Sequence, residues 1–222
     1  MRKLFILMML FPLFVLSQND NTGKSNSKPT SKPTKAKLGI GLKAGVNFAN
    51  VTNASSIKSG NKTGFMVGAF MNPQSRGIFG YRMEVIYSKQ GYDFKTNTNT
   101  GTVDLDYILL PTLTAINLGK FAQLQLGMQT AFLLNAKADT SSSQSDSDPY
   151  GSLMQYHNRV NLGAAAGLEI YPFKGLLIGA RYNISFGDMY KQPSSPTTPM
   201  PSFFPAINAK NNVVQLFIGY RF

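Results

Sequence analysis

The last twelve residues of the chain, NNVVQLFIGYRF, alternate in chemical character with a period of two. From Val214 onward one parity is wholly apolar and ends on Tyr220 and Phe222, whereas the other includes Gln215, Gly219 and Arg221. A period of two is that of a β-strand, because successive side chains point to opposite faces of a sheet. The pattern therefore predicts a terminal strand with one apolar face and one mixed face.

The same alternation recurs in seven earlier runs. They are KLGIGLKAGVNFAN, TGFMVGAFM, GYRMEVIYSKQ, TVDLDYILLPTLTAINL, FAQLQLGMQTAFLLNA, RVNLGAAAGLEIYPF and LLIGARYNISFGD. In most of them one parity is apolar, while the other gathers glycine, amides, hydroxyls and charges. Pro111 interrupts the fourth run, and its missing backbone donor predicts a bulge or a local break there. Residues 37–222 are therefore expected to form eight strands.

The connections between the runs alternate in length. Long polar segments follow every odd-numbered run, at about 51–62, 91–101, 139–158 and 189–210. Short turns follow the second, fourth and sixth runs, at 72–77, 119–120 and 174–175. This alternation is typical of outer-membrane barrels, whose long loops lie outside the cell and whose tight turns are periplasmic. Both chain termini are then expected on the periplasmic side.

The distribution of polar residues favours a membrane barrel over a soluble one. A soluble barrel turns its apolar residues inward and its polar residues outward. Here the mixed face is too rich in glycine to be an aqueous surface, and its small residues suit a lumen filled by side chains. We therefore predict an all-β fold, an eight-stranded antiparallel up-and-down transmembrane β-barrel with lipid on its apolar face.

The first 36 residues differ from the barrel region. Residues 1–17 have a basic start, an apolar run and Ser17 before a polar segment, which predicts a secretory signal peptide, with a retained membrane anchor as the alternative. Residues 18–36 are rich in Ser, Asn, Lys and Pro and contain a near-repeat of SKPT. We expect this segment to be a disordered periplasmic tail.

Composition excludes several classes of function. The 222-residue chain has no cysteine, which excludes disulfides, thiolate metal sites and a cysteine nucleophile. Part of its net charge of +12 lies in the leader and tail, and the rest is spread without a basic helix or an aromatic-basic motif. We therefore expect no nucleic-acid partner.

Charged residues of the mixed parity identify a candidate site. Counted from the strand ends, five of them should lie at similar depth in the periplasmic half of the lumen: Lys43, Arg82, Glu84, Glu169 and Arg181. The alternation predicts the same inward parity for Asp104, Asp106 and Arg221. Burying an unpaired charge in a narrow interior costs on the order of several kcal/mol, so a lumenal salt-bridge network is expected. We interpret it as a structural plug, with a gate or proton path as the alternative.

Aromatic residues bracket the apolar band, as they do at membrane interfaces. Near the periplasmic ends the expected anchors are Tyr81, Phe121, Phe173, Tyr220 and Phe222. Toward the outer ends they are Phe48, Tyr87, Tyr107, Phe132 and Phe186.

Residues that would support catalysis or metal binding are few. The only histidine, His157, lies in a long loop with Ser152, Tyr156, Asp146 and Asp148. These residue types occur in rim enzymes, but the loop shows no recognisable motif. The spacing of its acids fits no calcium loop. We therefore expect no catalytic residue, no metal site and no cofactor.

Several runs resemble a known family. The segments that carry the likeness are GLKAGVNFANV, EVIYSKQG, YILLPTLTAINL, GLEIYPFKGLLIGARYNISFGD and the terminal GYRF. They are similar to the PorT-type outer-membrane β-barrel proteins of Bacteroidetes-like bacteria. The resemblance implies insertion into the outer membrane, with the terminal aromatic strand as the signal read by the assembly machinery. PorT is associated with secretion and gliding, but no residue here carries that role over.

Three functions remain open at this point. The first is a non-enzymatic barrel acting in structure, adhesion, or assembly and secretion; the second is a narrow transport channel; the third is a rim enzyme acting on lipid or peptide. The expected partners are outer-membrane lipid, the outer-membrane assembly machinery, and a protein bound by the loops at 139–158 and 189–210. The second of these loops is rich in proline and is equally compatible with folding against the barrel mouth.

Overall fold

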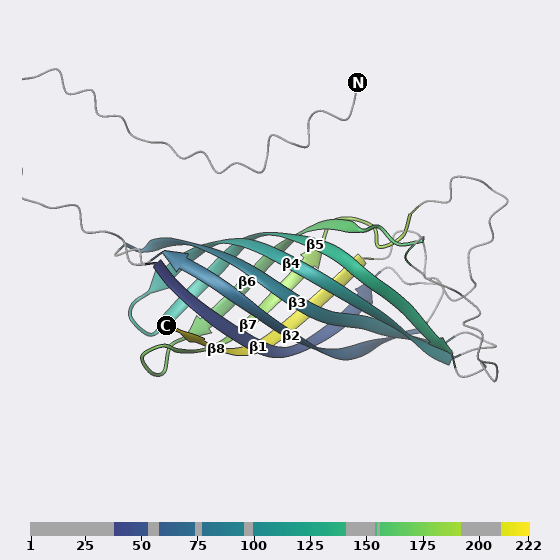
Figure 1. Ribbon diagram of the computed structural model, residues 1–222, viewed down its shortest axis with the longest axis horizontal. Helices are drawn as coiled ribbons and strands as arrows, with labels where there is room; N and C mark the ends of the chain where they lie inside the picture. The colour runs from purple at the N-terminus through teal and green to yellow at the C-terminus, as the bar shows by residue number, and fades with distance from the viewer. Residues whose placement is uncertain are drawn as a thin grey trace, which may run out of the picture. The chain divides into compact units, whose positions relative to one another are not determined.

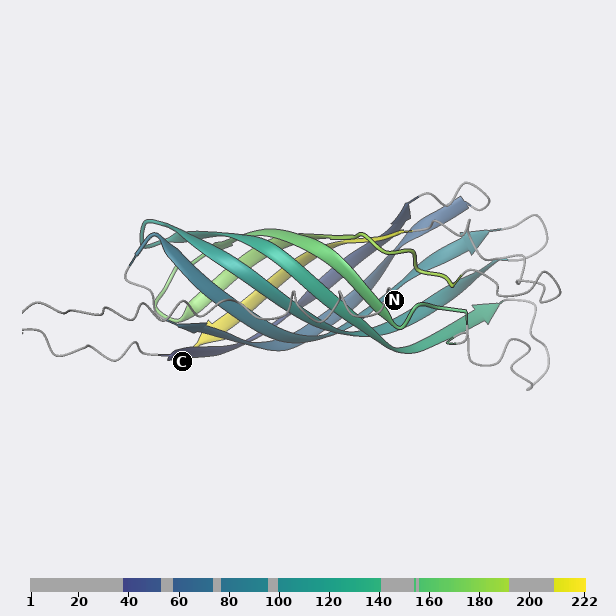
Figure 2. The same cartoon turned by 90° about the horizontal axis from the view of Figure 1, so that it is seen from above.

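Eight strands form a closed barrel in the computed structural model, which describes residues 38–52, 58–73, 77–95, 100–140, 154, 156–191 and 210–222. The strands are β1 (Leu38–Thr52), β2 (Lys58–Pro73), β3 (Phe79–Lys95), β4 (Thr100–Leu118), β5 (Ala122–Thr140), β6 (Val160–Ile170), β7 (Leu176–Ser185) and β8 (Lys210–Arg221). Each pairs antiparallel with its neighbours in sequence, and β1 pairs with β8 (Figures 1 and 2). The predicted eight-stranded up-and-down barrel is therefore confirmed. The segments expected to be a signal peptide and a tail lie outside the described residues.

The two ends of the barrel differ. The end of β8 and the start of β1 lie at one end, which we call the turn end; it also carries the connections at Gly119 and Gly175 (Figure 1). These two glycines have φ values of 75° and 86°, a left-handed conformation that side chains disfavour. The opposite end, which we call the loop end, carries the connections after β1, β3, β5 and β7.

An apolar belt surrounds the barrel. On β8, the outward side chains from Val214 to Tyr220 are 41% to 53% exposed, although all of them are apolar or aromatic. On β4 the outward positions from Leu118 to Ile108 are apolar or threonine, and Asp106 follows. A transmembrane strand needs about nine to eleven residues, a length that segment 108–118 provides. The belt is thus as tall as a bilayer core. Within the described residues, no helix is long and apolar enough to cross a membrane.

The fourth strand faces the opposite way from the sequence prediction. Val103, Leu105 and Tyr107 point into the barrel and are at most 3% exposed, whereas Asp104 and Asp106 lie on the outer face. The expectation that these two acids point inward is therefore wrong, as is the expected role of Tyr107 as an outer anchor. Polarity does not identify the inner face here, because the lumen at this height is apolar.

Outward contacts hold the two acids of β4. Lys62 Nζ lies 2.8 Å from Asp104, and the Tyr87 hydroxyl donates to Asp106 at 3.1 Å. Asn135, which shares its odd parity with the buried Gln123 and Gln125 and is expected inside on that ground, also donates to Asp106 at 3.2 Å. It faces outward because the register between β4 and β5 shifts at this point, and one extra residue turns the following side chains to the other face.

The ladder between β3 and β4 opens beside Pro111. Pairing runs to Met83↔Thr112 and resumes at Ile86↔Leu109 in the same register. The expected irregularity is thus a local break rather than a bulge, because proline has no N–H to donate.

Four strands continue past the belt at the loop end. β4 and β5 have 19 residues each, whereas β6 has 11 and β7 has 10. Figure 1 shows β4 and β5 running beyond the end of β8. We call residues 58–61, 91–95, 100–106 and 135–140 the loop-end extension. The loop expected at 91–101 is shorter than predicted, because β3 continues to Lys95 and β4 begins at Thr100.

Candidate functional site

One buried cluster of charged side chains fills the turn half of the lumen. Lys43 donates to Glu84 at 2.6 Å, and Arg181 donates to both carboxylate oxygens of Glu84 at 2.6 and 2.9 Å. Arg82 bridges the two acids, donating at 2.7 Å to Glu84 and at 2.8 Å to Glu169. All five side chains are 0% exposed. The structure thus brings together every residue that the sequence placed at this depth, and we call this group the charge cluster.

Glycines opposite the charge cluster make room for its long side chains. Lys43 is paired with Gly68 on β2 and Gly219 on β8, while Glu169 is paired with Gly179 on β7. A Cβ atom at Gly179 would lie 2.9 Å from Glu169 Cγ, and one at Gly219 would lie 2.9 Å from Lys43 Cβ. The inward glycines therefore position the charges by leaving space for them.

Two aromatic rings balance the excess positive charge. The charge cluster contains three cations and two carboxylates, so its formal charge is +1 (3 − 2). The Arg82 guanidinium lies 3.9 Å from the centre of the Phe70 ring, and Lys43 Nζ lies 4.2 Å from that of Phe217. The face of an aromatic ring attracts a cation. The sequence placed both phenylalanines on the mixed parity, and an aromatic ring among polar inward residues was the signal for this role.

A chain of hydrogen bonds joins the charge cluster to the turn end. The Tyr171 hydroxyl lies 2.9 Å from Glu169 Oε2 and 3.2 Å from Gln123 Oε1. Gln123 donates in turn to Asn117 at 2.8 Å. Burial, together with the nearby Glu169 carboxylate, raises the pKa of Tyr171 above its ordinary value. Tyr171 therefore remains a neutral hydrogen-bonding group at physiological pH.

Amide side chains occupy the middle of the lumen. Asn47 donates to Ser88 at 2.8 Å, Gln215 donates to Asn47 at 3.1 Å, and Asn211 donates to Gln90 at 2.6 Å. Beside them lies a small cavity of about 30 Å³. Sequence reasoning placed these amides on the mixed parity without connecting them to one another.

Apolar side chains close the loop half of the lumen. Tyr92, Phe94 and Leu105 belong to a buried cluster that also includes Met189 and Tyr190, from the segment after β7. The hydroxyl groups of Tyr92 and Tyr190 are 2.5 Å apart. We call this group the apolar plug. Its segment 186–191 is held by backbone bonds to the residues before β6, including Asn158 N to Met189 O at 2.9 Å.

The only histidine is part of the packing around this plug. His157 is 0% exposed, pairs with Tyr190 in a β-bridge, and its ring lies 4.8 Å from the Tyr190 ring. The loop residues Ser152, Asp146 and Asp148, considered with it as parts of a rim enzyme, lie outside the described residues. In the part of the chain that is described, no group of three potential metal ligands occurs.

Four of the aromatic residues expected as membrane anchors, Tyr81, Phe121, Tyr220 and Phe222, lie at the turn end. Tyr220 and Phe222 are 50% and 76% exposed and pack edge to face at 5.4 Å. Phe121 is 72% exposed, and Tyr81 is half-buried. Anchoring at the membrane interface remains a prediction for all four.

Comparison with known proteins identifies the family to which the chain belongs. Residues 17–191 match the family described as outer membrane protein beta-barrel domain. No curated protein matches the chain. The specific PorT resemblance remains a prediction, because the matching family is the broader one.

Three solved structures are similar to the chain at low sequence identity. Ail, the attachment invasion locus protein of Yersinia pestis, is 14% identical over 83% of this chain and 98% of its own, with a TM-score of 0.47. Neisserial surface protein A is 13% identical over 83% and 97%, with a TM-score of 0.49. OprG from Pseudomonas aeruginosa is 13% identical over 83% and 95%, with a TM-score of 0.45. From the family match, the chain belongs to the outer-membrane β-barrel proteins and is located in the outer membrane of Gram-negative bacteria.

Proposed function

We propose that the protein is a non-enzymatic, non-conducting barrel that presents its loop end to a partner outside the cell. The observation that carries this proposal is the length of β2–β5, which continue beyond the membrane-spanning belt while β6–β8 do not. A barrel that only needed to cross the bilayer would have no use for strands of 19 residues.

The orientation follows from the connections. Outer-membrane barrels have short periplasmic turns and longer external loops. On this basis the turn end, with both termini, faces the periplasm, and the loop-end extension stands outside the cell. We infer that the terminal aromatic strand, which ends on Phe222, is the segment that the assembly machinery reads.

A filled lumen argues against the alternative of a transport channel. From the turn end outward, the described lumen contains the charge cluster, the amide layer with its cavity of about 30 Å³, and the apolar plug. Moving an ion through it would require breaking buried ion pairs, which are costly to separate.

The loop-end extension offers two binding features. The outer face at this end carries Asp104 and Asp106 within the extension and Lys62 and Lys89 beside it, which suit a polar protein surface. In addition, β5 pairs with β6 only as far as Phe132↔Val160, so among the described strands none pairs with that edge beyond this point. An open strand edge can accept an extended peptide by strand addition. We propose that the partner binds here, together with the loops at 139–158 and 189–210.

The first test is electrical. The purified protein, reconstituted into a planar bilayer, is expected to give no steady ionic current. As a positive control, a wide-lumen porin is measured in the same bilayer. A reproducible unitary conductance would refute the filled-lumen proposal.

The second test locates the partner. A photo-activated cross-linking amino acid replaces the exposed Lys137 on the extension, and a matched variant carries it at the exposed Lys174 of the turn end. On intact cells, position 137 is expected to cross-link to an externally added or neighbouring surface protein, and position 174 is not. Adducts at position 174 alone would place the binding surface at the other end.

A further inference from the structure

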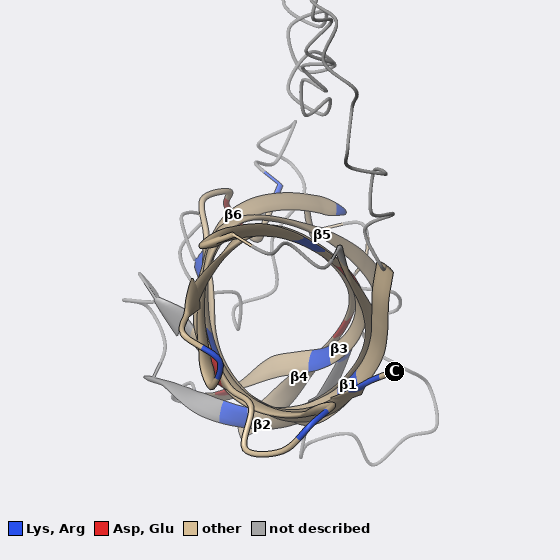
Figure 3. Ribbon diagram, turned by 90° about the vertical axis from the view of Figure 1, so that its left-hand side faces the viewer, with Lys and Arg blue, Asp and Glu red and all other residues tan. Residues whose placement is uncertain are grey.

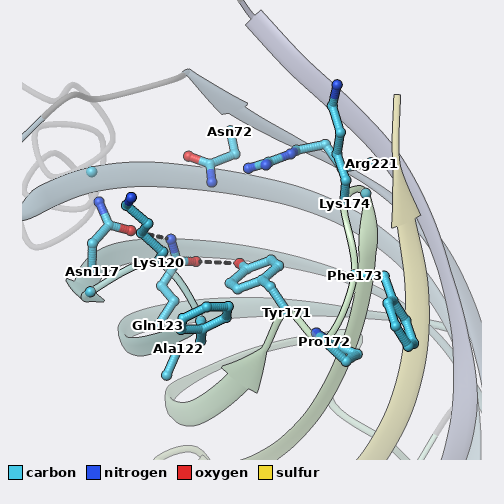
Figure 4. A pocket seen from close by; sticks show the side chains of 14 residues that line it. Asn72, Asn117, Lys120, Ala122, Gln123, Tyr171, Pro172, Phe173, Lys174 and Arg221 are labelled. Atoms are coloured by element: carbon cyan, nitrogen blue, oxygen red, sulfur yellow. Dashed lines mark hydrogen bonds between the residues drawn. The ribbon is translucent and has the colours of Figure 1, made fainter.

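A basic pocket opens at the turn end of the barrel. Its volume is about 510 Å³, within the range of small-molecule sites. Its lining includes Asn72, Asn117, Lys120, Tyr171, Lys174 and Arg221 (Figure 4). We call it the turn-end pocket. It lies outside the charge cluster and plays no part in the function proposed above.

Three cations border this pocket, and no carboxylate lines it. Arg221, Lys120 and Lys174 form no ion pair within the described residues. The acidic side chains described in the structure lie elsewhere: Glu84 and Glu169 belong to the buried cluster, and the aspartates lie at the loop end. The positive charge of the pocket is therefore not neutralised by neighbouring side chains.

The Arg221 guanidinium forms no hydrogen bond within the described residues. It lies 5.8 Å from the centre of the Tyr171 ring. Its Cδ passes close to Gly39, where an added Cβ would come within 3.1 Å. Figure 4 shows the guanidinium extending across the pocket toward Asn72. Its planar set of N–H donors therefore remains available and matches the oxygens of an anion.

The three rim cations act on a ligand in the same direction. A cleft of one sign with low-dielectric walls focuses the electric field and concentrates counter-ions. Tyr171 on the pocket lining lies between these cations and the nearest member of the charge cluster, the Glu169 carboxylate, which is 2.9 Å from its hydroxyl. The attraction for anions therefore comes from Arg221, Lys120 and Lys174 rather than from the buried cluster.

We propose that the turn-end pocket binds a phosphate group. A carboxylate carries one negative charge on two oxygens and would leave part of the charge of three cations unpaired. A phosphate group has more oxygens and can carry two negative charges. Phe121 and Phe173, which also line the pocket, are 72% and 73% exposed at its rim. The phosphate is supplied either by the headgroup of an anionic phospholipid beside these rings or by a soluble phosphorylated molecule.

The test measures binding to the full protein in lipid nanodiscs. The soluble probes are inorganic phosphate and glycerol 3-phosphate. Their binding to the protein in phosphatidylcholine discs is measured by titration calorimetry. The lipid probe is phosphatidylglycerol, included in or omitted from the discs and followed by the ³¹P signal of its headgroup. Saturable binding of either probe class supports the proposal and identifies the source.

Two variants and one control make the result specific. Arg221→Gln and the double variant Lys120→Gln with Lys174→Gln are each expected to weaken binding about tenfold, because charge-assisted hydrogen bonds are lost. The double variant changes only exposed turn residues, so it remains informative if Arg221→Gln does not fold. Lys137→Gln removes one positive charge at the loop end and is expected to bind like the wild type. The proposal is overturned if the wild type binds neither probe, if neither folded pocket variant weakens binding, or if Lys137→Gln weakens it equally.

Discussion

Polar and apolar side chains face opposite sides of the sheet in the loop and turn halves of the barrel. In the membrane-spanning turn half, the charge cluster lies inside and apolar residues lie outside (Figure 3 looks along the barrel from this end). In the loop-end extension, Leu105 and Tyr92 are buried inside, while Asp104 and Asp106 lie outside. The same sheet is therefore an inside-out membrane wall at one end and an ordinary water-soluble sheet at the other.

The change of solvent explains the inversion. Lipid leaves an outward polar group without partners, so the wall in the belt is apolar and its polar groups turn inward. Above the belt, water solvates the outer face, and burying apolar surface inside becomes the favourable arrangement. On β4 the change occurs between Ile108 and Asp106. We expect the boundary of the bilayer on the loop side to lie at this position.

The largest expected effect tests the charged half. Glu84→Ala removes the carboxylate that pairs with Lys43, Arg82 and Arg181, leaving buried cations without their main partner. We expect a loss of about 3–5 kcal/mol in the free energy of unfolding. Urea unfolding in detergent, followed by heat-modifiable gel mobility, measures it. If Glu84→Ala lowered the free energy of unfolding by less than Leu105→Ala does, the charge cluster would contribute little to the difference between the two halves of the barrel.

An intermediate effect is expected in the apolar half. Leu105→Ala leaves a cavity in the apolar plug, where the side chain is 1% exposed. A loss of about 2–4 kcal/mol is expected from lost burial and the residual cavity. The matched control is Leu110→Ala on the same strand, whose side chain is 37% exposed in the lipid-facing belt. If the control lost as much stability as Leu105→Ala, the loop half would not be packed like a soluble core.

The smallest effect is expected on the outer face of the extension. Asp104→Asn breaks the pair with Lys62 at 2.8 Å, in which the carboxylate is 34% exposed. Such exposed pairs contribute about 0–1 kcal/mol and are screened by salt. The difference between wild type and variant should therefore shrink when unfolding is repeated at high ionic strength. A salt-independent loss as large as that of Glu84→Ala would show that Asp104 is not facing water.

Part of the candidate site followed from strand periodicity. Lys43, Arg82, Glu84, Glu169 and Arg181 share the inward parity, and their distances from the strand ends put them at one depth. Their partners were harder to find. Which ring lies beneath which cation depends on the strand register and on the glycines beside it, and neither is a local property of the sequence.

The sequence by itself determined the number of strands, their antiparallel order and the two kinds of connection, because alternation and turn residues are local signals. Only the tertiary structure decided which face of β4 points inward. Both faces of that strand carry apolar residues, and the meaning of a polar residue depends on whether lipid or water lies outside. The register shift beside Asn135 shows the same limit, since one added residue reverses every side chain that follows. The turn-end pocket likewise exists only because the closed barrel brings Arg221, Lys120 and Lys174 around one opening.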